Sequence, residues 1–305
     1  MPALRLPKTL PPWREILASA ESESWYPLLF DRADEAHAAA MDELIAEREV
    51  MSIHDTIDAQ LKDLVRSTTP SKPYTDEEIE QEIARLLDGR SQQDYGRWGF
   101  FPWSRRLVHL LPPGPFVALR SDRNRNKITT DEQAKLRKLK IALAGLSVGN
   151  AVAVTLALEG VFGELRLADF DTLDLSNMNR IRCGVHHLGI NKAIIAARQI
   201  YEQNPYANLV LFTDGVTADN LGEFIDGAGP GDRADIVIDE CDSIYIKVKL
   251  REEARARRLP VLMETSDRGM LDIERFDLEP DRPILHGLLG GVTAEQVNQM
   301  PPPAR

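Results

Sequence analysis

Short apolar runs and helical patterns alternate along the second half of the chain. From residue 140 onward, apolar runs with the length of buried strands are separated by segments whose apolar residues recur every three or four positions. The expected strands are Ile141 to Ala144, Leu165 to Ala168, Leu209 to Thr213, Ile236 to Ile238 and Val261 to Met263. The expected helices are Asn150 to Leu158, Lys192 to Gln203, Ala218 to Ile225 and Ile244 to Arg257. This alternation predicts an α/β domain with a doubly wound, Rossmann-like and mainly parallel sheet.

The first 120 residues have a different pattern, which favours helix. Thr75 and Glu78 have the spacing of a capping box, in which each side chain bonds the other residue's backbone amide. In the segment that follows residue 120, Thr130 and Gln133 have the same spacing and predict a second, short helix. The segment from Asp34 to Val65 is rich in Ala, Glu and Leu and predicts two helices.

These patterns divide the chain into three parts. We expect a mostly helical domain at residues 1–120, the Rossmann-like domain at 121–290, and a flexible, proline-rich tail at 291–305. The helix that follows Gly149 is apolar nearly all round, so we expect it to be buried between the sheet and its neighbours.

Composition excludes several classes of protein. The chain has 305 residues and a net charge of -11, which argues against general binding to nucleic acid or to anionic lipid. Its 2 cysteines lack the paired spacing of a zinc site and are too few for a disulfide framework. It has no apolar signal core near Met1 and no apolar run of membrane-spanning length. A cytoplasmic location is expected.

Polar residues follow the ends of the predicted strands, where an open α/β sheet binds its ligand. The first is a glycine turn, Gly145-Leu-Ser147-Val-Gly149, which follows a strand and opens a helix. Its backbone amides are suited to a phosphate, but a turn required only for packing is equally consistent with the sequence. Asp169 follows the next strand, 24 residues after Gly145. That spacing suits a carboxylate that binds ribose hydroxyls, in a dinucleotide or in ATP.

Two further residues, Arg180 and Lys192, favour ATP over a dinucleotide. Arg180 and Lys192 lie 12 residues apart, and paired cations are what a leaving pyrophosphate needs. Asp242 follows a strand at a position that suits a Mg²⁺ ligand, although Asp242 and Ser243 are equally good caps for the next helix. Arg125 lies in a basic segment whose simplest interpretation is a solvated linker.

Two other groups of residues give weaker signals. The aromatic residues from Tyr95 to Trp103 are more consistent with packing of a loop than with a ligand pocket. His186 and His187 are adjacent but have no ligand spacing around them, so a zinc site is not expected.

Taken in order, these motifs resemble the ThiF, MoeB and ubiquitin-activating family of adenylyltransferases, and most of all actinobacterial ThiF-type proteins of the MoeY type. The motifs that carry the resemblance are Asn124-Arg125-Asn126, the glycine turn, Asp169-Phe170-Asp171, Ser176-Asn177-Met178-Asn179-Arg180, Gly189-Ile190-Asn191-Lys192, Asn204-Pro205 and Asp239-Glu240-Cys241-Asp242.

The resemblance implies a site and a reaction. It implies that the turn residues Gly145, Ser147 and Gly149 and the side chains of Asp169, Asn177, Arg180 and Lys192 bind ATP, that Asp242 holds Mg²⁺, and that Arg125 reaches the partner's site in a homodimer. Arg125, Arg180 and Lys192 would be the catalytic cations. A carboxylate of a ubiquitin-like sulfur carrier or of a peptide would attack ATP to form an acyl-adenylate.

Two alternatives remain open at this stage. A dinucleotide-dependent oxidoreductase would use the turn and Asp169 equally well. A catalytically silent ThiF-fold scaffold is the other, because the turn is one residue shorter than the family's G-x-G-G-x-G and the zinc and thioester cysteines of many members are absent.

Overall fold

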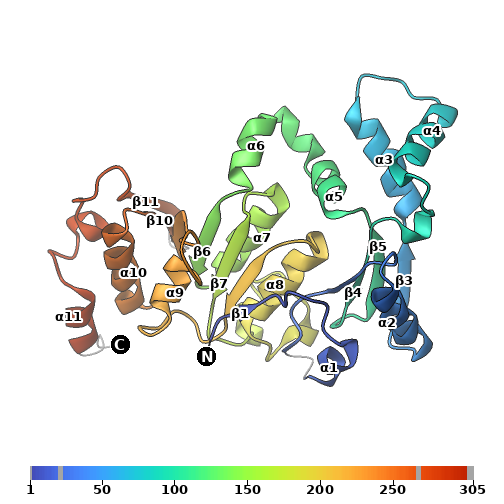
Figure 1. The fold of residues 1–305 in the computed structure, drawn as a ribbon. Helices are drawn as coiled ribbons and strands as arrows, with labels where there is room; N and C mark the ends of the chain where they lie inside the picture. The colour runs from blue at the N-terminus through green and yellow to red at the C-terminus, as the bar shows by residue number, and fades with distance from the viewer. Residues whose placement is uncertain (1, 20–22, 266–268, 301–305) are drawn as a thin grey trace. The chain divides into compact units, whose positions relative to one another are not determined.

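The chain forms two compact units in the computed structural model, which describes residues 2–19, 23–265 and 269–300. The N-terminal unit is Pro7–Glu132, and the C-terminal unit combines Met1–Leu6 with Gln133–Arg305. Figure 1 shows the elements of both units in chain order. The chain passes from one unit to the other within helix α6 (Thr130–Leu136).

A seven-stranded sheet with the order β1-β8-β7-β6-β9-β10-β11 forms the centre of the C-terminal unit. Its strands are β1 (Leu4–Arg5), β6 (Lys140–Ala144), β7 (Glu164–Ala168), β8 (Leu209–Phe212), β9 (Ile236–Asp239), β10 (Pro260–Thr265) and β11 (Met270–Arg275). The five strands from β8 to β10 are parallel, and β1 and β11 add antiparallel edges. The predicted α/β class, with a mainly parallel sheet, is confirmed.

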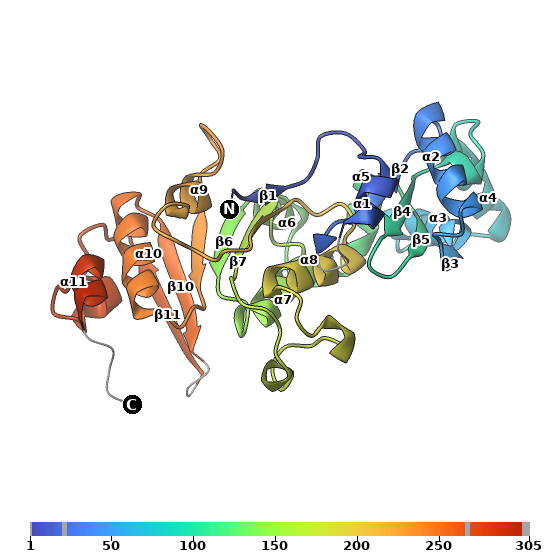
Figure 2. The same cartoon turned by 90° about the horizontal axis from the view of Figure 1, so that it is seen from below.

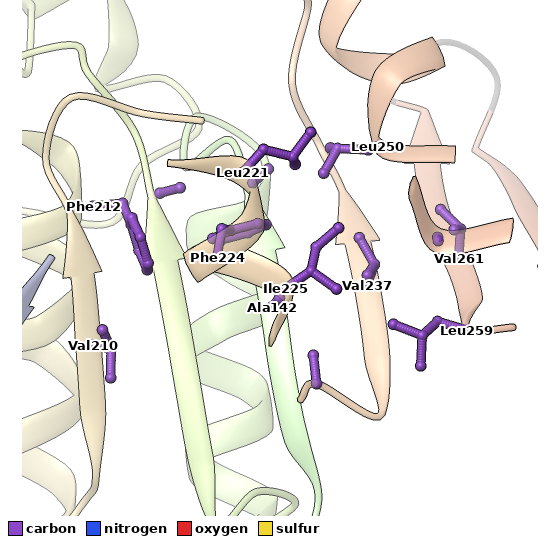
Figure 3. Close-up of a cluster of buried hydrophobic side chains, with 14 of the residues drawn as sticks. Ala142, Val210, Phe212, Leu221, Phe224, Ile225, Val237, Leu250, Leu259 and Val261 are labelled. Atoms are coloured by element: carbon purple, nitrogen blue, oxygen red, sulfur yellow. The ribbon is translucent and has the colours of Figure 1, made fainter. Parts of the chain in front are cut away.

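Helices cover the sheet on both faces, as Figure 2 shows. They are α7 (Gly149–Glu159) and α8 (Lys192–Gln203) on one face and α9 (Leu221–Asp226) and α10 (Ile244–Ala256) on the other. All residues of β7 and β8 are buried: β8 is a continuous apolar run, and the two charged residues of β7, Glu164 and Arg166, pair with each other. Figure 3 shows the core beneath α9 and α10, where Phe224 packs edge-on against Phe212 with ring centroids 5.3 Å apart.

The C-terminal end of this unit differs from the sequence prediction. Strand β11 was missed because its pattern is inverted: Asp272 and Glu274 point inward, while Leu271 and Ile273 are exposed. A flexible tail was expected from residue 291, but α11 (Ala294–Gln299) forms there with a capping box from Thr293. Residues 301–305 lie outside the described residues.

Helix α7 is only partly buried, which corrects the expectation that it would be enclosed. Ala153 and Ala157 face the core, whereas Ala151 and Leu158 are exposed and Val154 is half-buried. Leu158 is 56% exposed. The helix is apolar all round, but a single copy of the chain covers only one side of it.

The N-terminal unit contains a sheet that the sequence analysis did not predict. Its order is β2-β4-β5-β3, formed by β2 (Leu28–Phe30), β3 (Ser52–Asp55), β4 (Arg97–Phe101) and β5 (Arg106–Leu110). Its helices are α1 (Trp13–Ala18), α2 (Glu35–Ala46), α3 (Ile57–Thr68), α4 (Asp76–Leu87) and α5 (Pro113–Arg120). The expected helices are therefore present, but the description of residues 1–120 as mostly helical is not confirmed.

Of the two capping boxes predicted from the sequence, one forms as expected and the other is shifted by one residue. The Thr75 capping box is present, with the Glu78 amide donating to the Thr75 hydroxyl. The second box begins one residue earlier than expected, at Thr129 with Glu132, because Gln133 is turned inward to donate to the Gly160 carbonyl (2.9 Å).

The aromatic residues of this unit pack as expected. Tyr95, Trp98, Phe100 and Phe101 are all buried, and the ring of Trp98 stacks on His109.

Candidate functional site

A cavity of about 140 Å³ opens where β6, β7 and β9 end. All three strands are parallel, so their carboxyl ends meet at one edge of the sheet. The cavity is lined by Ala144, Gly145, Leu146, Ser147, Ala168, Asp169, Phe170, Asp171, Gly215, Val216, Glu240, Cys241, Asp242, Ser243 and Ile246. It therefore brings together four of the residues expected from sequence: Gly145, Ser147, Asp169 and Asp242.

Packing requires Gly145 and leaves little room for a side chain at Gly149. Gly145 has φ +91°, and a Cβ there would lie 2.4 Å from the Glu240 carbonyl oxygen. A Cβ on Gly149 would lie 2.8 Å from a side-chain carbon of Leu143. From the sequence, a turn required only for packing and a turn that binds phosphate were equally good interpretations. The close contacts at these two positions explain the glycines by packing. A contact between the turn and phosphate stays a prediction.

Asp169 fastens the glycine turn to the end of β7. Its Oδ2 accepts from the Leu146 amide (2.7 Å), and its Oδ1 accepts from the Asp171 amide (2.8 Å). Burial raises the pKa of this carboxyl, while the two amides and Lys192 act in the opposite direction. Each carboxylate oxygen has a second lone pair, so Asp169 can still accept from a ligand hydroxyl.

Lys192 joins the turn to the loop after β7. It is the first residue of α8 and is 4% exposed, and its Nζ donates to Asp171 Oδ2 (2.8 Å) and to Ser147 Oγ (3.1 Å). Both partners line the cavity. The preceding residue, Asn191, caps α8 and also donates to the Asp169 carbonyl, which fixes the position where the lysine begins.

Asp242 has no role as a helix cap. The cap of α10 is Ser243, whose hydroxyl accepts from the Ile246 amide. The Asp242 carboxylate is exposed at the cavity wall and forms no hydrogen bond or ion pair with any residue that the structure describes. From the sequence, a helix cap and a metal ligand were equally good interpretations of Asp242. The structure assigns the cap to Ser243, and a role of Asp242 as a metal ligand stays a prediction.

Glu240 and Cys241 complete that wall and were not expected as site residues. Glu240 is 9% exposed, and burial raises the pKa of its carboxyl to about 6. Its Oε1 accepts from the Glu264 amide (2.9 Å). The Cys241 thiol donates to Asp239 Oδ1 (2.8 Å), and burial strongly raises its pKa, so it is not a ready nucleophile.

An apolar wall on the cavity was also missed. It consists of Phe170, Val216 and Ile246, and Phe170 is 72% exposed at the mouth of the cavity. Gly215 has φ +70°, and its Cβ would lie 3.0 Å from the Phe170 ring. Phe170 was identifiable from its place between two aspartates at a strand end. Val216 and Ile246 carry no local signal and are brought in by the fold.

Three of the expected residues lie elsewhere. Asn177 is buried and completes the capping box of a short 3-10 helix, where its Oδ1 accepts from the amide of the cap residue Asp174 (3.0 Å). Arg180 is exposed, donates to Asn179 Oδ1 (3.0 Å), and lines a different cavity of about 370 Å³ beside α7 and α8. Arg125 belongs to the N-terminal unit and pairs with Asp122.

Other kinds of site are absent from the described residues. No three His, Cys, Asp or Glu side chains in residues 2–19, 23–265 and 269–300 are grouped so as to hold a metal ion. Within the same ranges, no helix has the length and hydropathy needed to cross a membrane.

Comparison with known proteins identifies relatives. The ThiF family profile matches residues 121–290. An uncharacterized protein of Mycobacterium tuberculosis is 47% identical over 253 residues, covering 81% of this chain and 34% of that protein. The molybdopterin-synthase adenylyltransferase of Haemophilus influenzae is 30% identical, covering 52% of this chain and 63% of that enzyme. The chain thus spans about a third of the first relative's length and less than two thirds of the second's.

Among solved structures, the E. coli tRNA N6-threonylcarbamoyladenosine dehydratase TcdA in complex with ATP is similar to this chain. The TM-score is 0.45 at 25% identity, with 51% of this chain and 62% of that chain covered.

Proposed function

The chain belongs to the ThiF family, and on that premise we propose that it is an ATP-dependent adenylyltransferase that activates a carboxylate. The substrate carboxylate would be the C-terminus of a ubiquitin-like sulfur carrier or of a peptide. The observation that carries the proposal is the meeting of Asp169, Lys192 and Asp242 around one cavity at the strand ends.

The cavity suits a nucleotide in its division of polar and apolar walls. Phe170, Val216 and Ile246 provide an apolar surface for a base, and the Asp169 carboxylate lies at the end of β7, where a ribose hydroxyl would donate. Lys192 is held beside Ser147 and Asp171 by two hydrogen bonds, so its charge is already positioned before phosphate arrives.

Asp242 fits Mg²⁺ in the way the ion is usually bound beside a nucleotide. Mg²⁺ prefers one or two carboxylates and completes its shell with phosphate oxygens and water. The exposed carboxylate of Asp242, which forms no hydrogen bond or ion pair with the described residues, would supply such a ligand. When bound, the ion would neutralise charge on the phosphates.

The cavity wall is acidic, so binding of a triphosphate would need cations from outside the wall. Asp169, Asp171, Glu240 and Asp242 line it, and no Lys or Arg is among its described lining residues. A triphosphate is strongly repelled by such a wall unless cations are added from outside. We propose that Mg²⁺, Arg180 and the Arg125 of a second copy supply them.

A homodimer is proposed for the same reason, and the surface of α7 supports it. Ala151, Val154 and Leu158 form an apolar stripe along the helix that one copy of the chain leaves open. Arg180 and this stripe line the separate cavity of about 370 Å³ beside α7 and α8, so a partner seated there would lie next to a cation that we propose for the reaction. We propose that a second copy of this chain covers the stripe on α7.

In the proposed reaction the substrate provides its own nucleophile. Its carboxylate oxygen attacks the α-phosphate of ATP, the bond to the β-phosphate breaks, and pyrophosphate leaves with its electron pair. The protein's contribution is positioning and charge neutralisation by Lys192 and the arginines. No cysteine is needed for this step, in agreement with the bonded thiol of Cys241.

Exchange between ATP and labelled pyrophosphate tests the proposal. The full chain is mixed with Mg²⁺, ATP, labelled pyrophosphate and small carrier proteins or peptides that end in glycine. Label should enter ATP only when an acceptor carboxylate is present. Saturable ATP binding without exchange for any acceptor would instead favour a silent scaffold, and tighter binding of NADH than of ATP would favour an oxidoreductase.

A further inference from the structure

One group of buried charges is not used by the proposed reaction. The Arg251 side chain, on α10, is 0% exposed, and it pairs with Asp239 at the end of β9 and with Glu274 on β11. Its Nη2 also lies 3.8 Å from an oxygen of Asp272. A guanidinium with no access to water needs such partners, and its planar fork can serve two carboxylates at once.

Asp239 links this guanidinium to the wall of the nucleotide cavity. One oxygen of Asp239 accepts from Arg251, while the other accepts from the amide (3.2 Å) and the thiol (2.8 Å) of Cys241. The Lys247 ammonium also lies 3.4 Å from both oxygens. The carboxylate is therefore the anchor of the turn from residue 239 to residue 243, which carries Glu240 and Asp242.

Glu274 links the same guanidinium to the far edge of the sheet. Its Oε2 pairs with Arg251, and its Oε1 accepts from the Leu285 amide (2.6 Å). The pairing explains the inverted pattern of β11: Glu274 and Asp272 face Arg251, and Leu271 and Ile273 are left exposed. A shift of one residue would bury these apolar side chains and separate the charges.

Burying Arg251 with its carboxylates is expensive and gives little net stability compared with an apolar core. Exposing two large apolar residues on β11 adds to that cost. The ion pairs of Arg251 therefore contribute little to stability. They do connect α10, β9 and β11 to the turn from residue 239 to residue 243, and we take the position of this turn to be their role.

We propose that Arg251 is a positioning residue of the nucleotide site: through Asp239 it holds the turn that carries Asp242 against strand β11. The inference deepens the proposed function and rests on it only for the identity of the ligand. Arg251 is not among the described residues that line the cavity, and its hydrogen-bond and ion-pair partners do not line it either, so its effect would pass through Asp239 and the residue 239–243 turn.

Cys241 gives a readout of the turn that needs no ligand. Its half-buried thiol donates to Asp239, so it should react faster with a thiol reagent when the turn opens and this bond is lost. The chain has one other cysteine, Cys183, and Cys183→Ser removes its signal. The labelling rate of Cys241 is then measured by reaction with a chromogenic disulfide in the full chain.

Arg251→Lys and Glu274→Gln are the two test variants, and Arg166→Lys is the matched control. Lysine keeps the charge of Arg251 but cannot bridge two carboxylates with a fixed fork. Arg166 has an equally buried guanidinium in the same unit, which pairs with Glu164 and the carbonyls of Phe224 and Ile225 and does not contact the turn. Arg166→Lys therefore removes a buried guanidinium, as Arg251→Lys does, at a place that does not contact the nucleotide cavity.

We expect Arg251→Lys and Glu274→Gln to raise the labelling rate of Cys241 by about tenfold or more over Arg166→Lys at equal global stability. Half-saturation by Mg²⁺ in ATP binding should move to higher concentration in the same two variants. Labelling no faster in Arg251→Lys than in Arg166→Lys overturns the inference. Glu274→Gln decides by the same criterion if Arg251→Lys does not fold. If wild-type protein shows no ATP binding, the proposed function fails, while the labelling comparison still decides the role of Arg251.

Discussion

Replacing Lys192 by methionine separates its role in the fold from its role in binding. Lys192 is 4% exposed, and methionine keeps most of its buried stem while removing the ammonium that bonds to Asp171 and Ser147. The Asp171 side chain is 51% exposed, so water can replace the lost partner there. Loss of these bonds and relief from burying a charge oppose each other, so the free energy of unfolding should change by no more than about 1 kcal/mol.

Binding of ATP should respond much more strongly to the same change. A hydrogen bond from a charged group to phosphate contributes about 1.5 to 3 kcal/mol, so Lys192→Met should weaken ATP binding by roughly 10-fold to 150-fold. Urea unfolding measures the first quantity, and equilibrium titration with ATP and Mg²⁺ measures the second.

Lys140→Met is the matched control for this variant. Lys140 Nζ donates to Asp232 Oδ1 (3.0 Å) and to the Gly231 carbonyl (2.7 Å), and it lies at the start of β6, away from the strand ends that form the cavity. It should leave ATP affinity unchanged. The reasoning is refuted if Lys192→Met is folded and binds ATP as tightly as wild type, or if Lys140→Met weakens binding equally.

Three further substitutions test other parts of the structure. Asp242→Asn should leave urea unfolding unchanged, because the carboxylate is exposed and unbonded among the described residues, yet raise the Mg²⁺ concentration for half-maximal ATP binding by about tenfold. Leu158→Glu should shift the chain toward monomer in sedimentation velocity without lowering its unfolding free energy, and a dimer that persists would contradict the interface on α7. Arg257→Met should cost about 0.5 to 1 kcal/mol at pH 7, since hydrogen bonds from Arg257 lower the pKa of Asp226 and of Glu253. A carboxyl whose pKa is lowered in the fold contributes stability that is fully present above its usual pKa, near about 4, and is lost as the pH falls through the lowered value. The difference between Arg257→Met and wild type should therefore shrink below about pH 4, and a difference as large at pH 2 to 3 as at pH 7 in urea titrations would contradict the assignment.

The sequence predicted the parallel part of the fold well because buried parallel strands have strong local signals. All five expected strands from Ile141 to Met263 formed, and α8 has the expected bounds of Lys192–Gln203. Strand β11 could not be found in this way, since its apolar residues face outward and its inward acids depend on Arg251, 23 residues away from Glu274. The two-residue strand β1 likewise depends on pairing with distant β8.

The candidate site was predictable where residues follow strand ends. Asp169 and Asp242 are carried to the cavity by β7 and β9, and Lys192 reaches its lining from the start of α8. Arg180 and Asn177 lie in the segment between β7 and α8, whose path local sequence does not determine, and in a single copy they lie outside the cavity. The apolar wall was not predicted because Val216 and Ile246 lie in separate parts of the chain, and only the fold brings them together.

Competitive titration with ATP and NADH tests the central claim most directly. The full chain is titrated with each nucleotide, with and without Mg²⁺, and Lys192→Met is titrated in parallel. We expect saturable ATP binding that requires Mg²⁺, is at least about tenfold tighter than NADH binding, and is weakened by the substitution. ATP binding that is absent, or weaker than NADH binding, or unaffected by loss of Lys192, would contradict an ATP site in this cavity.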